Sequence, residues 1–257
     1  MALRTPDPVA LSVGSFEVRW YGLCFAGGIA LVWLTMRLLT RDRAWGIRSD
    51  YVDGVMVWNS MALVVGGRVG EMLFYQTGQW LADPWSVLDI DRGGMSFFGG
   101  MIGVAITLTV YERAHGIPSW RLFDLTAVAA PLGLGLGRVG NWLNGEFLGP
   151  TTNLAWATIA PSGELRHPVV LYQALMEGFL LFLLLFGVIS IFKVQRSGGI
   201  AVAIFLIFSS ISRFILDPLR PDSTAVGFLN ISVSQYLCIL FFMIGAIILA
   251  KIVVLKE

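Results

Sequence analysis

The chain has 257 residues, of which 56% are hydrophobic and only 14% are charged. A soluble domain averages about 25% charged residues, so this deficit, which extends along the whole chain, indicates a surface that mostly faces something other than water. The net charge of +1 gives no reason to expect electrostatic attraction to nucleic acid.

The first twenty residues have a mixed composition that includes Pro6, Pro8 and Glu17. They lack a basic segment followed directly by an apolar run, so we do not expect a cleaved signal peptide. The first long apolar run begins near Trp20, and we expect it to remain as a membrane anchor.

Seven apolar stretches are candidates for membrane-spanning helices, which need about 20 mostly apolar residues each. They cover approximately residues 21–39, 52–75, 96–111, 122–142, 169–192, 198–217 and 232–255. No repeat, low-complexity tract or long linker divides the chain. We therefore expect an all-α, polytopic membrane protein with about seven transmembrane helices in a single domain, residues 1–257.

Basic residues indicate how these helices are oriented. They gather after the first, third, fifth and seventh stretches, as Arg37, Arg41, Arg43, Arg48, Arg113, Arg121, Lys193, Arg196, Lys251 and Lys256. One loop on the other side carries Asp83, Asp89 and Asp91 with Arg92 alone. The positive-inside rule then predicts a cytoplasmic C-terminus and an N-terminus outside.

Cysteine and histidine usage predicts neither a disulfide framework nor a metal site. Cys24 and Cys238 both lie in apolar runs, where cysteine usually behaves as a small buried hydrophobic residue. The two histidines and two cysteines lack the spacing of zinc ligands, and we expect no cofactor.

The segment GRVGNWLNGEFLG, residues 137–149, carries the strongest indication of chemistry. Arg138, Asn141 and Asn144 are spaced so that a helix would present them roughly together. Glu146 follows at once, and the planar guanidinium of Arg138 suits bidentate binding of a phosphate. The alternative is a packing helix of small residues with one arginine at the membrane surface, but it leaves the asparagines and Glu146 unexplained.

A second cluster lies in SRFILDPLRPD, residues 212–222. Arg213, Asp217 and Arg220 have the spacing of one helical face, which would suit an anionic ligand. Pro218 disfavours α geometry at Asp217, and a helix break there would spoil this alignment. The alternative is that both arginines anchor a helix at the membrane interface.

Three further features carry weaker indications. The glycine-rich segment 91–100 around Ser96 could present backbone N–H groups to an anion. Arg68 and Glu71, three residues apart, could form either a structural ion pair or part of a site. His167 precedes an apolar run, and an isolated histidine at such a position is more often structural than catalytic.

Taken together, these segments resemble the bacterial prolipoprotein diacylglyceryl transferase family. They occur in the family's order as VRWYG at 18–22, GGR at 66–68, RGGMSF at 92–97, GRVGNWLNGE at 137–146, HP and LY within 167–172, and RF and RPD within 213–222. GRVGNWLNGE looks like the family signature, and the resemblance covers nearly the whole chain.

The resemblance implies a reaction at the bacterial inner membrane. The thiol of the lipobox cysteine in a prolipoprotein signal peptide would attack the glycerol carbon of phosphatidylglycerol that carries the phosphoester. A thioether would form and glycerol-1-phosphate would leave, which is the first step of lipoprotein maturation. The active site of this multi-pass protein would face the outer leaflet.

The resemblance also implies roles for individual residues. The expected catalytic residues are Tyr21, Arg138, Glu146, Arg213 and Asp217. The residues expected to bind phosphatidylglycerol are Ser96, Arg138, Asn141, Asn144, Gly149 and Arg220.

The chain departs from the family pattern at positions that bear on proton transfer. Phe98 stands where the family usually has a histidine regarded as the base, and phenylalanine cannot accept a proton. Ser209 replaces a usual tyrosine, Gln173 replaces a glutamate, and Pro218 is unusual. These departures affect the assignment of the base and the level of activity more than the fold.

Two hypotheses follow, with a third class less favoured. In an active transferase, the proton goes to Asp217, Glu146, His167 or the substrate phosphate. In a divergent paralogue, the chain binds phospholipid or lipoprotein with weak or no catalysis. A small-solute transporter would need polar groups near mid-membrane on several helices, whereas most charges here gather at one face.

Overall fold

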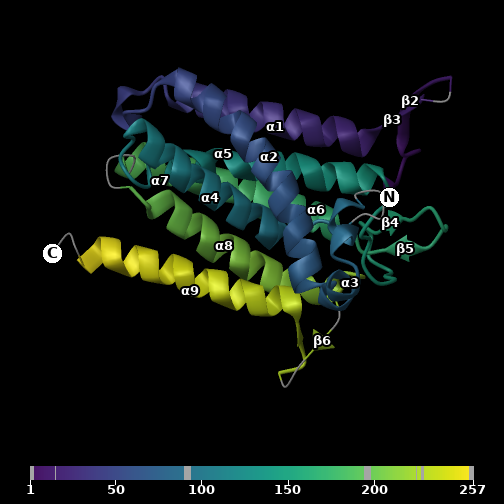
Figure 1. Ribbon diagram of the computed structural model, residues 1–257. Coiled ribbons are helices and arrows are strands. Elements are labelled where there is room, and N and C mark those ends of the chain that lie inside the picture. Colours follow the sequence, from purple (N-terminus) through teal and green to yellow (C-terminus); the bar gives the residue numbers. More distant parts are fainter. Residues whose placement is uncertain are drawn as a thin grey trace.

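The computed structural model describes residues 3–14, 16–89, 94–193, 198–223, 225–226 and 229–254. In this part of the chain a bundle of long helices dominates, as Figure 1 shows. The bundle consists of α1 (Trp20–Leu39), α2 (Ser49–Phe74), α4 (Phe97–His115), α5 (Arg121–Leu143), the continuous run α6 (Val169–Gln173), η4 (Ala174–Leu180) and α7 (Leu181–Phe192), α8 (Ile200–Leu216) and α9 (Val233–Val254). Each of the seven apolar stretches predicted from the sequence is helical.

Five of these helical runs are long and apolar enough to cross a membrane. They are Trp20–Leu39, Arg121–Leu143, Val169–Phe192, Ile200–Leu219 and Val233–Val254. The protein is therefore a helical membrane protein. Helices α2 and α4 are not among the five; α2 carries charged residues toward both ends, such as Asp50 and Arg68.

Glycine allows the helices to approach closely. Helix α1 packs along α5, α2 along α4 and α8 along α9. Where α2 meets α4, a side chain added at Gly99 would overlap the carbonyl oxygen of Gly66 and lie 2.6 Å from Cα of Gly70. Small residues at such crossings let two backbones pack directly against each other, which is a common basis for helix association in membranes.

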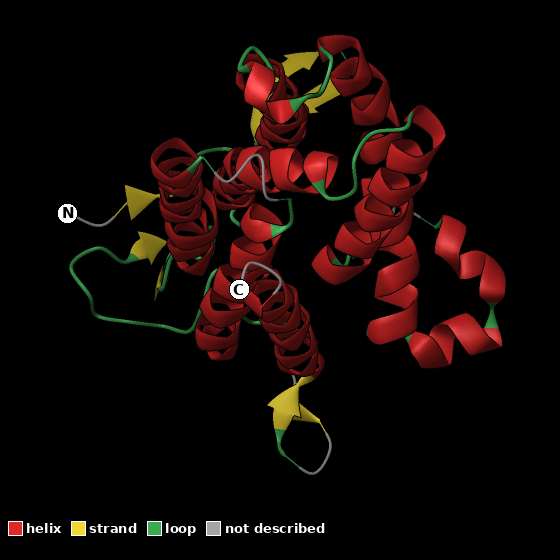
Figure 2. Ribbon diagram, turned by 90° about the vertical axis from the view of Figure 1, so that its left-hand side faces the viewer, coloured by secondary structure: helices red, strands yellow, loops and turns green. Residues whose placement is uncertain are grey.

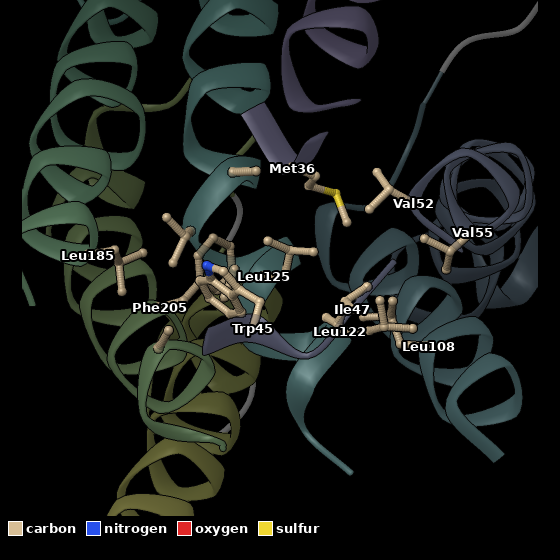
Figure 3. Close-up of a cluster of buried hydrophobic side chains, with 14 of the residues drawn as sticks. Met36, Trp45, Ile47, Val52, Val55, Leu108, Leu122, Leu125, Leu185 and Phe205 are labelled. Carbon is tan, nitrogen blue, oxygen red and sulfur yellow. The ribbon is translucent and has the colours of Figure 1, made fainter. Parts of the chain in front are cut away.

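The apolar core lies toward the end of the bundle where α1 and α7 finish. The 3₁₀ turn η1 (Arg43–Trp45) places the indole of Trp45, only 1% exposed, among Met36, Leu125 and Leu185 (Figure 3). This end therefore has a packed apolar interior, as expected of a region whose task is to hold the bundle together.

Two buried carboxylates at that same end cap helices. Asp124 accepts backbone N–H groups of Gly199 and Val202 at the start of α8, at 2.7 and 2.9 Å. Glu112 accepts the N–H groups of Trp120 and Leu122 at the start of α5, at 3.1 and 2.8 Å. Both carboxylates satisfy N–H groups that helix starts leave without intrahelical partners.

Short strands gather at the opposite end, which we call the strand-bearing end. Figures 1 and 2 show them at the margin of the helices. They form three small sheets: β1 (Leu3–Arg4) with β4 (Thr158–Ile159) and β5 (Leu165–Arg166), β2 (Val9–Val13) with β3 (Phe16–Arg19), and β6 (Ala225–Val226) with β7 (Ile231–Ser232). The all-α prediction did not include them; they satisfy backbone groups of the connecting loops.

Arg68 is a structural anchor at the strand-bearing end. Its guanidinium donates to the carbonyl oxygens of Ser86, Val87 and Asp89 at 2.8, 3.0 and 2.8 Å. These carbonyls belong to η2 (Pro84–Leu88) and the residue after it, which follow the short helix α3 (Thr77–Ala82). Of the two predicted roles for Arg68, these contacts favour the structural one.

Candidate functional site

Residues from four distant segments come together at the strand-bearing end. Tyr21 lies in the first turn of α1, Arg138 in the last turns of α5, and Arg213 in the last turn of α8. Arg138 interacts electrostatically with Tyr21, Glu177, Arg213 and Arg220. The arginines that the sequence placed in two separate clusters therefore share one region.

The side chains of the 137–149 segment form a connected chain of hydrogen bonds. Arg138 Nη1 donates to Asn141 Oδ1 at 3.4 Å, and Asn141 Nδ2 donates to Glu146 Oε2 at 3.0 Å. Asn144 Nδ2 donates to the other oxygen of Glu146, also at 3.0 Å. The chain turns back through Gly145, whose φ of 71° suits glycine, so that Glu146 faces the end of the helix it has just left.

Arg213 is buried and held from two sides. Only 5% of the residue is exposed, and its Nη2 donates to Glu177 Oε2 at 3.0 Å. Its guanidinium carbon lies 3.6 Å from the ring centroid of Phe97, which is within the range of a cation–π contact. An ion pair and an aromatic face thus set the direction in which the remaining donors point.

Sequence reasoning missed both Glu177 and Phe97 as site residues. For Glu177 a signal was present, because a lone carboxylate within the apolar run Val169–Phe192 is costly and by default suggests function. Phe97 gave no such signal, since one phenylalanine among many at a helix start is ordinary.

Asp217 joins the end of α8 to the loop and strand that precede α9. Its Oδ2 accepts hydrogen bonds from the hydroxyls of Ser223 and Ser232, both at 2.6 Å, and the residue is 2% exposed. Helix α8 ends at Leu216 and continues as the 3₁₀ turn η6 (Asp217–Leu219). The expectation that Pro218 keeps Asp217 out of α geometry was wrong, because Asp217 has φ −57° and ψ −43°. The catalytic role of Asp217 stays a prediction.

Arg220 forms an ion pair with Asp222. Its Nε and Nη2 donate to the two oxygens of Asp222 at 3.0 and 2.6 Å, and its guanidinium lies 5.5 Å from the Phe147 ring. Burial by itself raises the pKa of Asp222, but the hydrogen bonds and charge of Arg220 outweigh it and leave that pKa below its ordinary value. Both partners are therefore charged at neutral pH.

Gly149 and Ser96 make local structural contacts. A Cβ at Gly149 would lie 2.6 Å from Val169 Cγ2 and 2.8 Å from the carbonyl oxygen of Leu219, so the glycine lets the loop after α5 pack against α6 and η6. The hydroxyl of Ser96 accepts the N–H of Gly99 at 3.2 Å and caps α4. Their expected contacts with phosphatidylglycerol stay predictions. Of the glycine-rich segment 91–100, residues 91–93 lie outside the described part of the chain.

Two positions discussed as proton acceptors have other partners. His167 Nδ1 lies 3.3 Å from the Tyr172 hydroxyl, which accepts the indole N–H of Trp156 at 2.9 Å. Phe98 is 1% exposed and stacks on Phe241, with ring centroids 5.3 Å apart. Position 98 is thus part of the packing between α4 and α9.

We expect Phe97→Leu to lower turnover about tenfold or more, because the cation–π contact of a desolvated guanidinium contributes about 2 kcal/mol to its placement. The matched control is Phe97→Tyr, which keeps an aromatic face beneath Arg213. The measurement is steady-state turnover of the purified variants. Equal rates for Phe97→Leu and Phe97→Tyr would show that the ring contributes only its volume.

The chain is similar in sequence to known proteins over most of its length. The family model of prolipoprotein diacylglyceryl transferase matches residues 8–251. A phosphatidylglycerol–prolipoprotein diacylglyceryl transferase of Agrobacterium fabrum is 38% identical over 231 residues, covering 87% of this chain and 82% of that protein. The protein of the same name from Solidesulfovibrio magneticus is 36% identical over 252 residues, covering 95% and 94%. The chain belongs to the prolipoprotein diacylglyceryl transferase family, whose members are membrane enzymes of lipoprotein biosynthesis.

Proposed function

We propose that the protein transfers the diacylglyceryl group of phosphatidylglycerol to the lipobox cysteine of prolipoproteins. The observation that carries this proposal is the cluster of Arg138, Arg213 and Arg220 at one end of the bundle, in a chain of this family. The names of its relatives contain both substrates, phosphatidylglycerol and prolipoprotein.

The reaction forms a C–S bond to the diacylated glycerol and breaks the C–O bond between that glycerol carbon and the phosphate. The phosphodiester carries one negative charge, and the departing oxygen gains charge as the bond breaks. Cations fixed in advance beside that oxygen stabilise the transition state more than the ground state. Arg138 suits this task because, among the described residues, Arg213 and Arg220 have salt-bridged carboxylates while Arg138 has none.

The thiol proton must be removed, since the thiolate is the nucleophile. Of the candidates, Asp217 is buried and already accepts two hydroxyl hydrogen bonds, and His167 lies beside Tyr172. Glu146 also accepts two hydrogen bonds, but it is exposed and joined to Arg138 through Asn141. We therefore favour Glu146, followed by the phosphate itself, as the acceptor.

The proposal includes a topology of seven spans with the N-terminus outside, the C-terminus in the cytoplasm and the site at the outer leaflet of the bacterial inner membrane. Helices α2 and α4 would then span as a closely packed pair beside the five more apolar runs. Support comes from basic residues at the end opposite the site, including Arg41, Arg43 and Arg48. Phosphatidylglycerol would enter from the bilayer, and the signal peptide from the same leaflet.

The test is complementation of a strain depleted of its own transferase, together with an assay of glycerol-1-phosphate release by the purified protein. We expect growth to be restored and release to require both phosphatidylglycerol and a signal peptide with its cysteine. Replacement of that cysteine by serine in the peptide is the control. Binding of both substrates without release would instead favour the divergent paralogue.

We expect Phe98→His to leave turnover no higher than in the natural chain. The Phe98 ring is 1% exposed and packs on Phe241, so an imidazole there replaces a buried packing contact. Phe98→Leu is the control for lost stacking. A large gain with histidine alone would show that the natural chain lacks its base and catalyses poorly.

A further inference from the structure

The interface between the α6–η4 run and α8 contains buried polar atoms with few partners. Among the described residues, the atoms without a hydrogen-bond partner at this interface are Gln173 Nε2 and Oε1, Glu177 Oε1, Ser209 Oγ, Ser212 Oγ and Arg213 Nε. Buried polar groups are normally paired, so this concentration needs an explanation. Glu177 in particular uses one carboxylate oxygen for Arg213 and leaves the other free.

Glu177 lies in an unusual piece of backbone. The segment η4 (Ala174–Leu180) is π-helical, a geometry that is rare and is frequent at functional sites. Its Gly178 lies directly against Gly135 of α5, where an added Cβ would come within 2.6 Å of the Gly135 Cα. This contact brings η4 close to α5, and Glu177 interacts electrostatically with Arg138 as well as pairing with Arg213.

The position of Glu177 determines how much positive charge the site presents. Arg220 is paired with Asp222 and Arg213 with Glu177, so of the three arginines of the candidate site Arg138 is the one without a salt-bridged carboxylate among the described residues. Glu146 and Asp217 accept hydrogen bonds from neutral side chains and form no ion pair with these arginines, so Arg138 is the guanidinium left to face the single charge of a phosphodiester. The product, a phosphate monoester, has a second pKa of about 6 and carries nearly two charges at pH 8.

We propose that Glu177 is a positioning residue that orients Arg213 and, as its resident counter-ion, keeps the charge of the site low enough for the doubly charged product to leave. This inference rests on the proposed function and deepens it. Glu177 stays paired while the singly charged lipid is bound. As the phosphate gains charge, Arg213 turns its donors toward it, and the carboxylate draws Arg213 back when the product departs.

Removal of the Glu177 charge should therefore tighten product binding. We expect Glu177→Gln to lower the Kd of glycerol-1-phosphate at pH 8 about tenfold or more, because the effective attraction of a partly buried cation for an anion rises when its counter-ion is removed. The value of kcat should fall as product release slows, and KM for phosphatidylglycerol should fall with it. If Glu177 were purely structural, the variant would instead raise the KM for phosphatidylglycerol or leave both this KM and the Kd of glycerol-1-phosphate unchanged.

Two further variants make the measurement specific. Glu177→Asp keeps the charge with a shorter reach, so Kd should stay near that of the natural protein while kcat falls because Arg213 is held less firmly. Glu112→Gln neutralises another buried carboxylate at the opposite end of the bundle, and it should leave Kd unchanged. Equal Kd values for the natural protein and Glu177→Gln would overturn the inference.

A measurement on the natural protein covers the case in which Glu177→Gln does not accumulate. Infrared difference spectra of protein carrying ¹³C-labelled glutamate, with and without glycerol-1-phosphate, should show a shift of the Glu177 carboxylate band, identified by its loss in Glu177→Asp. Absence of that shift overturns the inference. Measurements of Kd and of the spectra need no turnover. A natural protein that binds added glycerol-1-phosphate but forms none from phosphatidylglycerol and a signal peptide would therefore refute the proposed function separately.

Discussion

Arg138→Ala is expected to reduce the release of glycerol-1-phosphate by a factor of about 10² to 10³, the effect of removing one preorganised donor from a developing oxyanion. Arg138 interacts electrostatically with Arg213 and Arg220, yet within the described chain it pairs with no carboxylate. Its removal therefore leaves no buried charge without a partner. Release from phosphatidylglycerol and a signal peptide by the purified, folded variant is the measurement.

Arg48→Ala is the matched control for Arg138→Ala. Arg48 forms an exposed ion pair with Asp50 at the opposite end of the bundle, where solvent and salt screen the attraction, so its removal should change stability little. It should keep the turnover of the natural protein. Arg138→Lys retains the charge but not the planar fork, and we expect an intermediate rate. Normal turnover by Arg138→Ala would remove Arg138 from the proposed mechanism.

Arg213→Ala is a less informative variant for the same purpose. It would leave Glu177, 1% exposed, without its partner, and breaking a buried pair in this way costs about 3–5 kcal/mol. Loss of activity would then combine a chemical and a structural effect. The contrast between the two arginines follows from their partners rather than from their positions in the sequence.

Gly99→Ala is expected to destabilise the protein strongly. The new Cβ would overlap the Gly66 carbonyl oxygen and lie 2.6 Å from the Gly70 Cα, so that α2 and α4 must separate. Overpacking of a well-packed contact costs about 1–3 kcal/mol and occasionally more, and backbone atoms have little freedom to yield. The thermal midpoint in detergent, followed by tryptophan fluorescence or size-exclusion chromatography, is the measurement.

Gly187→Ala provides the control for Gly99→Ala. Gly187 is also inside a helix, but a Cβ there would meet no atom within 4 Å. Alanine should be neutral or stabilising by about 0.5–1 kcal/mol, since glycine is the poorer helix former. Equal thermal midpoints for the two variants would show that the α2–α4 contact does not depend on its glycines.

The sequence by itself was sufficient to predict the helices and to single out the arginines that meet at the strand-bearing end. Apolar runs of about twenty residues predict membrane helices whatever their neighbours, because an unpaired backbone is too costly in lipid. All seven stretches are helical, whereas the expectation that Pro218 would keep Asp217 out of α geometry was wrong. Arg138 and Arg213 were recognisable as charges at the ends of apolar runs.

The tertiary structure decided which partner each of these charges has. Arg213 pairs with Glu177, thirty-six positions away, and rests on Phe97 from a third helix. Asp217, placed beside Arg213 by helical spacing, instead binds Ser223 and Ser232. Such contacts depend on the rotation and depth of each helix in the bundle, and these are set by packing between helices rather than by the local pattern of any one of them.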